Sequence, residues 1–183
     1  MATATAPETR TSWKIDPTHT SVEFSAKHLM ITTVRGRIAD VEGTIFTDES
    51  NPSNSSVEVV LQAASLDTRN EQRDQHLRSA DFLEVEKYPE ITFRSTRIEG
   101  TKERFKLVGD LTICGTAKEI VLDVTFEGEA KDPWGGERAG FTATGKFDRG
   151  DFGLTWNQAL ETGGVVVSNE IKILVEVQAT KQG

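Results

Sequence analysis

The side chains of this sequence best suited to acid–base or metal chemistry are three histidines, His19, His28 and His76. No two of them have the spacing of a metal-binding motif, and the single cysteine, Cys114, does not complete one. The sequence also lacks the Gly-x-Ser-x-Gly motif of a nucleophilic serine and a phosphate-binding glycine loop. We therefore expect no catalytic residues, no metal site and no cofactor.

His28 has the most informative position of the three, because it continues an alternating row formed by Val22, Phe24 and Ala26. If the apolar face of this segment is the inner one, the ring of His28 points into the protein. Two interpretations follow. His28 is either an inward residue hydrogen-bonded to a neighbour, which is the more usual role, or a polar group that contacts the head of a ligand.

Segments of alternating apolar and polar residues must position these side chains. The clearest runs from Phe105 to Ile113, with a large apolar residue at every second position except Gly109. A period of two is typical of strands with one dry and one wet face, so a set of such strands predicts a closed antiparallel barrel. The eight expected strands are 18–28, 33–47, 55–65, 90–98, 103–114, 119–129, 138–148 and 165–179.

The long link between Asp67 and Pro89 favours a short helix, which would lie in the connection between the third and fourth expected strands. Asp67 or Thr68 is its expected N-cap, and Pro89 must lie beyond its end. Leu77 and Phe82 supply an apolar side that we expect to pack against one end of the barrel. Its charged residues form either a solvated face or a network that holds the helix to the barrel rim: Arg69, Arg73, Asp74 and Arg78.

The interior of such a barrel is either filled by side chains or hollow, and composition leaves both alternatives open. Phenylalanines within the expected strands favour filling: Phe24, Phe46, Phe93, Phe105, Phe126, Phe141 and Phe147. Small residues favour a hollow: Ala26, Gly36, Ala63, Gly109, Ala143 and Gly145. From the strand registers we expect one elongated pore lined by Phe24, His28, Phe93, Phe126, Phe141 and Ala143. An inserted residue would exchange the two faces, most readily between Ile38 and Val41, where the alternation changes phase.

The composition suits one domain and limits the partners. The chain has 183 residues and a formal net charge of -8, with acidic residues in nearly every segment, which disfavours nucleic acid and anionic membrane surfaces. No apolar run approaches the roughly 20 residues that span a bilayer, so we expect no stable membrane insertion. The N-terminal residues lack the apolar core of a Sec-type signal peptide.

From these features we expect an all-β barrel domain at 13–180, preceded by a disordered tail at 1–12. We also expect a cytoplasmic protein, unless a signal was removed from a longer precursor. A homodimer is an open alternative.

Several motifs, spread from Trp13 to about Ala179, resemble those of the YceI family of lipocalin-like proteins. The opening matches at 13–24 (WKIDPTHTSVEF), followed by His28 and 34–36. The most specific stretch lies between residues 66 and 93. The remaining matches are 109–118, 149–153 and the Gly-Gly-Val run at 163–165. Family members more often carry Val-Thr where this chain has Thr116 and Ala117.

The resemblance implies an extended eight-stranded antiparallel barrel with a hydrophobic pore. Members of the family bind long isoprenoid chains, including polyprenyl quinones or related amphiphiles, and are associated with transport, storage or stress response. Many are periplasmic and carry signal peptides, from which this sequence departs. We therefore expect a polyisoprenoid lipid or quinone as the partner. The alternatives are a lipid-modifying enzyme, with His28 as acid or base and Asp67 or Asp74 beside it, and a packed structural barrel without a ligand.

Overall fold

Strands with alternating burial make up most of the chain. The computed structural model describes residues 10–157 and 166–182, and within them one α-helix, α1 (Glu71–Arg78), accompanies eleven strands. The strands are β1 (Arg10–Ile15), β2 (Ser21–His28), β3 (Thr32–Ile38), β4 (Val41–Asp48), β5 (Ser56–Gln62), β6 (Leu66–Asp67), β7 (Glu90–Gly100), β8 (Arg104–Ile113), β9 (Thr116–Lys131), β10 (Glu137–Asp148) and β11 (Glu170–Lys181). Short 3-10 turns lie at η1 (Pro17–His19), η2 (Pro52–Asn54), η3 (Ala63–Ser65) and η4 (Arg149–Phe152).

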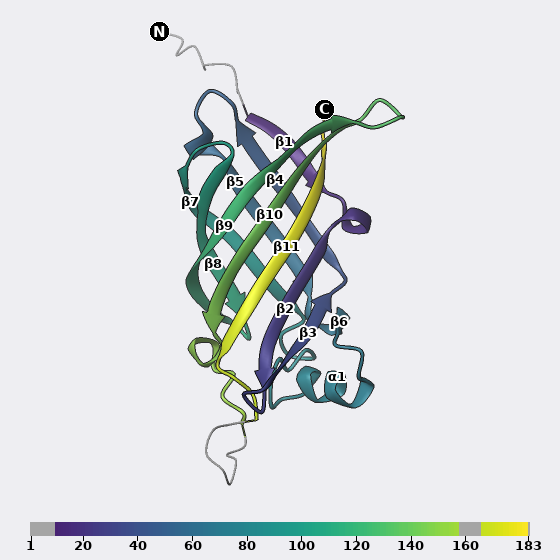
Figure 1. The fold of residues 1–183 in the computed structure, drawn as a ribbon, viewed down its shortest axis with the longest axis vertical. Helices are drawn as coiled ribbons and strands as arrows, with labels where there is room; N and C mark the ends of the chain where they lie inside the picture. The colour runs from purple at the N-terminus through teal and green to yellow at the C-terminus, as the bar shows by residue number, and fades with distance from the viewer. Residues whose placement is uncertain (1–9, 158–165, 183) are drawn as a thin grey trace.

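The strands close into an antiparallel barrel, whose long axis is vertical in Figure 1. Within the described residues the order is β1-β4-β5-β7-β8-β9-β10-β11, and β1 pairs with β11 to close the ring of eight. β2 continues the line of β1, because β11 pairs with β1 at residues 179–181 and with β2 at 172–176. β3 lies beside β2 and leads into β4. The predicted closed, eight-stranded, all-β antiparallel barrel is therefore confirmed.

The barrel begins earlier than the sequence indicated. β1 starts at Arg10, and residues 10–12 pair with β4 at Asp48, Thr47 and Phe46. The expectation of a disordered tail was therefore wrong for these three residues, whose backbone hydrogen bonds are supplied by a strand distant in the sequence. Residues 1–9 of the expected tail lie outside the described residues.

One expected strand divides at Ala39 and Asp40 into β3 and β4. Ser65 holds this break, because its carbonyl accepts the backbone N–H of Ala39 (3.3 Å) and its hydroxyl accepts that of Asp40 (2.9 Å). Ile38 and Val41, on either side of the break, are both buried. The change of phase in the sequence therefore marks an irregularity that keeps apolar residues on the inner face.

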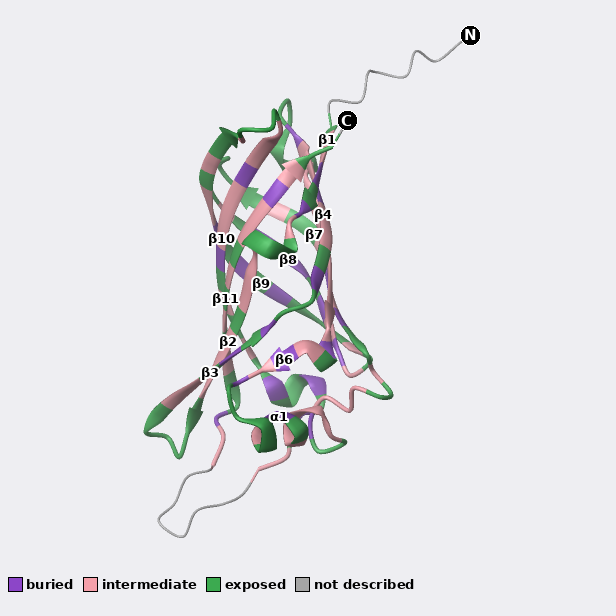
Figure 2. Cartoon of the chain, turned by 90° about the vertical axis from the view of Figure 1, so that its right-hand side faces the viewer, coloured by how far each residue is buried: buried purple, intermediate pink, exposed green. Residues whose placement is uncertain are grey.

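The helix α1 follows β6 and precedes β7, and it lies at one end of the barrel (Figures 1 and 2). Its N-cap is Asn70, whose side chain accepts the backbone N–H of Arg73 at 3.0 Å. The expected caps, Asp67 and Thr68, were wrong, because Asp67 instead accepts a backbone hydrogen bond (2.8 Å) in the turn before the helix. The helix ends before Phe82, which lies in the turns that follow it.

The charged residues of α1 hold it to the barrel. Asp74 is buried and accepts hydrogen bonds from the backbone N–H and the hydroxyl of Thr68. Arg73 donates to the carbonyl of Thr68 at 2.7 Å, and Arg78 donates to the carbonyl of Leu66 at 2.7 Å. The sequence left open whether these charged residues form a solvated face or a network that holds the helix to the barrel rim. The structure shows the network. It ties the helix to β6 and fixes the segment that covers this end of the barrel.

Candidate ligand cavity

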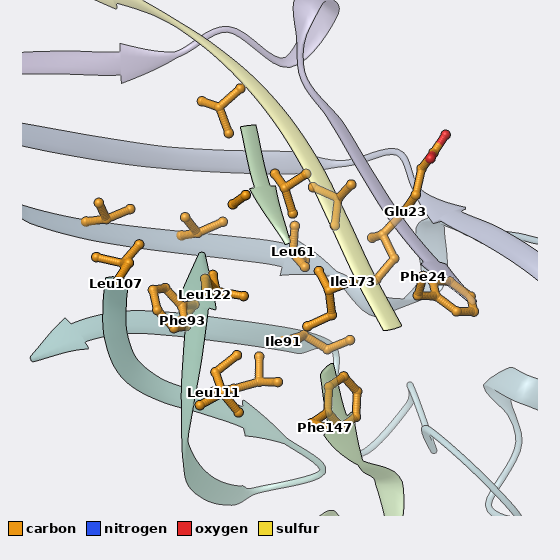
Figure 3. A pocket seen from close by; sticks show the side chains of 18 of the residues that line it. Glu23, Phe24, Leu61, Ile91, Phe93, Leu107, Leu111, Leu122, Phe147 and Ile173 are labelled. Atoms are coloured by element: carbon orange, nitrogen blue, oxygen red, sulfur yellow. The ribbon is translucent and has the colours of Figure 1, made fainter. Parts of the chain in front are cut away.

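A cavity of about 740 Å³ lies inside the barrel. Figure 3 shows apolar side chains from several strands facing this space, while the carboxylate of Glu23 points away from them. The labelled apolar residues are Phe24, Leu61, Ile91, Phe93, Leu107, Leu111, Leu122, Phe147 and Ile173. The barrel is therefore hollow, which decides between the two interiors that composition left open.

The six residues expected from the sequence all line this cavity: Phe24, His28, Phe93, Phe126, Phe141 and Ala143. They do not meet at one point. Phe126 and Phe141 form a pair near the end with the β9–β10 hairpin, with ring centroids 5.4 Å apart. Phe93 and Ala143 are buried, whereas His28 is exposed where β2 reaches the α1 end. That these residues contact a ligand stays a prediction.

Two of the aromatic side chains are positioned by glycines on neighbouring strands. Gly36 pairs with Phe24, and a Cβ atom at Gly36 would lie 2.4 Å from Cζ of that ring. A Cβ atom at Gly109 would lie 2.5 Å from Cζ of Phe93. Each ring therefore occupies the place of a missing side chain and lies against the barrel wall. These glycines do not leave empty volume themselves, as the sequence suggested; they let the rings stay close to the wall.

A cluster of rings at the α1 end was missed by sequence reasoning. His76 stands edge-on to Phe82 and Trp156, with ring centroids 5.1 and 4.6 Å away. Asp81 lies 2.9 Å from Nε2 of His76 and orients the imidazole. His76, Phe82 and Trp156 all line the cavity. Phe82 and Trp156 come from irregular segments, where strand alternation places nothing. Phe82 was expected to pack at this end of the barrel, but no pattern in the sequence placed His76 and Trp156 beside it.

Arg149 holds the irregular segments beside this cluster. Its buried guanidinium donates to the carbonyls of Ser168 (2.9 Å), Leu154 (2.7 Å) and Trp156 (2.9 Å). Burial lowers the pKa of Arg149, and the carbonyl oxygens replace part of the water that the cation has lost. Arg149 thus joins the residues after β10 to those before β11 and places Trp156 at the cavity wall.

Charged residues line the two ends of the cavity. They include Lys27, Arg73 and Arg149 at the α1 end, and Asp48, Glu49, Lys102 and Glu129 at the opposite end. The ammonium group of Lys102 lies 5.4 Å from the centroid of the Phe126 ring, within the range of a cation–π contact. Asp48 accepts hydrogen bonds from the backbone N–H and hydroxyl of Ser50. An apolar interior with polar ends suits an amphiphile better than a polar ligand.

No helix within residues 10–157 and 166–182 has the length and apolar character needed to cross a bilayer. The same described part of the chain contains no group of three or more His, Cys, Asp or Glu side chains that could hold a metal ion.

A closed eight-stranded antiparallel barrel around an apolar cavity defines a lipocalin-like barrel. The sequence model of the YceI-like domain matches residues 13–179, and the chain belongs to the YceI family. Protein YceI of Escherichia coli O157:H7 is 38% identical over 172 residues, which cover 93% of this chain and 87% of that protein.

Solved structures have the same fold. The Campylobacter jejuni YCEI protein is 35% identical, with a TM-score of 0.74 over 86% of this chain and 90% of its own. A polyisoprenoid binding domain from Saccharophagus degradans, implicated in plant cell wall breakdown, has a TM-score of 0.65 over 91% of this chain and 97% of its own. At 13% identity, this second likeness concerns the fold alone.

Proposed function

We propose that this protein binds a long-chain isoprenoid-type lipid, such as a polyprenyl quinone or related amphiphile, for transport, storage or stress response. The observation that carries the proposal is the apolar cavity of about 740 Å³ inside the barrel. This volume is within the range of about 300–1,000 Å³ that is typical of small-molecule sites. Membership of the YceI family and the similar barrel of a polyisoprenoid binding domain support the same ligand class.

The energetics suit a branched apolar tail with a small head. Burial contributes about 25 cal/mol per Å², so a tail that loses about 400 Å² of exposed surface gains about 10 kcal/mol. Ordering the flexible tail and restricting its motion remove several kcal/mol of that gain. The remainder supports reversible binding, as a carrier requires. The head group needs few contacts, because the tail supplies most of the free energy.

We infer that the six residues expected from the sequence contact the ligand at different heights. Phe93 and Ala143 lie along the tail, and Phe126 and Phe141 lie toward the β9–β10 end. His28 is exposed at the α1 end, where it is accessible to a polar head group. Phe24 lies on the same strand, four residues and two periods of the alternation away from His28.

Asp67 and Asp74 were the two carboxylates considered as catalytic partners for His28. Their contacts in the structure favour binding over catalysis. Asp74 is buried and accepts hydrogen bonds from Thr68. Asp67 accepts a backbone hydrogen bond and lies 3.7 Å from Arg37. Both carboxylates therefore have structural partners. Incubation of a polyprenyl quinone with the protein should return the quinone unchanged by mass spectrometry, and a new product would favour the enzyme.

A packed structural barrel is disfavoured by the size of the cavity. The cytoplasmic location and the homodimer considered from the sequence stay predictions. The helix α1 follows β6 and precedes β7, and its expected position between the third and fourth strands of the barrel stays a prediction.

A substitution that fills the cavity tests the binding site. Ala143 is buried and lines the cavity, whereas Thr144, the next residue of β10, is exposed. We expect Ala143→Trp to weaken the binding of a polyprenyl quinone about tenfold or more, because the indole occupies the volume of the tail. Thr144→Trp adds the same side chain outside and should leave the affinity unchanged.

The measurement is the amount of quinone retained by lipid-free protein after gel filtration, quantified by mass spectrometry, with folding checked by circular dichroism. A folded Ala143→Trp variant with full affinity would put the ligand elsewhere. If the native protein binds no polyprenyl lipid and none is found in its organic extract, the proposal fails.

A further inference from the structure

The turn between β2 and β3 exposes three consecutive large apolar residues. Leu29, Met30 and Ile31 are 38%, 56% and 77% exposed. In Figure 2 the β2–β3 hairpin extends away from the barrel at its α1 end, with an exposed tip. Leu29 and Met30 have φ angles of 52° and 61°, a left-handed conformation that costs free energy in residues other than glycine. Neither the exposure nor the strain benefits the isolated fold.

The charge around this tip is opposite to that of the whole chain. Residues 24–39 contain no Asp or Glu, although the sequence has 29 acidic residues and a net charge of -8. The same stretch contains Lys27, Arg35 and Arg37, which are all exposed. Arg37 faces Asp67 at 3.7 Å, so Lys27 and Arg35 contribute most to the local positive charge. The expectation that the chain avoids anionic surfaces came from its average charge and does not describe this hairpin.

The hairpin tip lies beside one end of the cavity. Lys27 and His28, which precede the tip, and Val34, which follows it, line the cavity, whereas the three tip residues do not. The base of the hairpin is held by a backbone hydrogen bond from Leu29 to the carbonyl of Val166 (2.9 Å). A surface that takes up the tip would therefore face the α1 end of the cavity.

We propose that the β2–β3 hairpin docks on an anionic lipid bilayer. Leu29, Met30 and Ile31 enter the interfacial layer, and Lys27 and Arg35 attract the lipid phosphates. The contact is shallow and reversible, since three residues cannot span a bilayer. It brings the α1 end of the cavity to the membrane, where long apolar lipids are dissolved. The purpose of the contact rests on the proposed function, but vesicle binding can be measured without it.

The opposite end of the barrel supplies a matched control. Trp134, in the turn between β9 and β10, is 85% exposed. Its surroundings are more acidic, with Asp132 accepting its backbone N–H at 2.9 Å and Glu129 and Glu137 exposed or half-buried nearby in the sequence. Removing this indole takes away an exposed apolar side chain at the end where we expect no contact with an anionic bilayer.

The test measures flotation of the full chain with vesicles of phosphatidylcholine and phosphatidylglycerol, compared with phosphatidylcholine alone. We expect the double variant Met30→Ser, Ile31→Ser to bind the anionic vesicles about tenfold more weakly or worse, because it removes most of the exposed apolar surface of the tip. Arg35→Gln should bind about fivefold more weakly, and the difference should vanish at high salt. Trp134→Ser should bind like the wild type.

Several outcomes would overturn the proposal. The proposal fails if the wild type does not bind anionic vesicles, or if the double variant binds them as well as the wild type does. It also fails if Trp134→Ser weakens the binding. A wild-type dimer that the double variant converts to a monomer, without vesicle binding, would assign the tip to a second copy of the chain. Quinone binding measured without vesicles separates the two proposals. The double variant should bind the quinone as the wild type does. A wild type that binds no quinone would refute the proposed function and leave the membrane proposal untouched.

Discussion

Phe82 offers a direct test of how the α1 end of the barrel is held together. Its ring is 9% exposed and stands 5.1 Å from the ring of His76 and 5.3 Å from that of Trp156. The guanidinium of Arg149 lies 5.9 Å from its centroid. Phe82 thus contacts the helix, the segment after β10 and the residue that anchors that segment. We expect Phe82→Ala to weaken the packing of the helix, of the segment after β10 and of Arg149, and so to lower the free energy of unfolding.

The magnitude follows from burial and from the cavity beside the ring. Truncation of a buried phenylalanine costs about 3–5 kcal/mol. Because Phe82 lines a cavity, one side of the ring has fewer neighbours, and we expect the lower end of that range, about 3 kcal/mol. For a chain of this size 1 kcal/mol changes Tm by about 2–4 °C, so Tm should fall by about 6–12 °C.

The assay is urea denaturation of lipid-free protein followed by circular dichroism. The control is Phe46→Ala, because Phe46 alternates with the cavity-lining Ile45 and Thr47 and its half-buried ring faces outward beneath Arg10, 4.9 Å away. This control should lose about 1 kcal/mol. A loss below about 0.5 kcal/mol for Phe82→Ala, or one equal to that of the control, would refute the docking of this end.

Three further predictions concern stability. Hydrogen bonds from Thr18, and then from His19 and Arg138, hold the pKa of Asp16 well below its ordinary value of 3.8. The stability that the Asp16 carboxylate contributes is therefore present above pH 3.8 and is lost as the pH falls below that value. Asp16→Asn should flatten the urea midpoint against pH in this acid range, and an unchanged slope would count against the argument. Gly109→Ala should destabilise by about 1–3 kcal/mol, because its Cβ atom would meet Phe93 at 2.5 Å; a neutral result in urea denaturation would show that the ring moves freely. Arg149→Gln should lose about 2–4 kcal/mol and speed hydrogen exchange in residues 154–157 and 166–169, whereas protection equal to the wild type would mean that other contacts hold these segments.

Local patterns were sufficient to predict much of the barrel. The alternation from Phe105 to Ile113 specifies the two faces of β8, because side chains on a strand alternate whatever their distant neighbours are. The same logic predicted inward positions for Phe93 and Ala143, and both line the cavity. The change of phase between Ile38 and Val41 was visible in the sequence, and it marks the break between β3 and β4.

Helix signals were less informative. The link before Pro89 contains α1, but the cap is Asn70 rather than Asp67 or Thr68. Each of these polar residues is a competent N-cap, so propensity could not choose among them. The choice was made by Asp74, whose buried carboxylate takes the hydrogen bonds of Thr68 and leaves Asn70 to begin the helix.

The sequence by itself determined most of the strands, their inner and outer faces and the family, since these depend on the order of residues along the chain. It did not predict β1 or β6, which are recognisable only by their pairing with other strands. Only the tertiary structure decided that the barrel is hollow, because that depends on where Phe24 and Phe93 lie relative to glycines on other strands. It also decided that Trp156 joins the cavity wall, held by Arg149 from an irregular segment. Such contacts join residues without a shared period, so no pattern in the sequence encodes them.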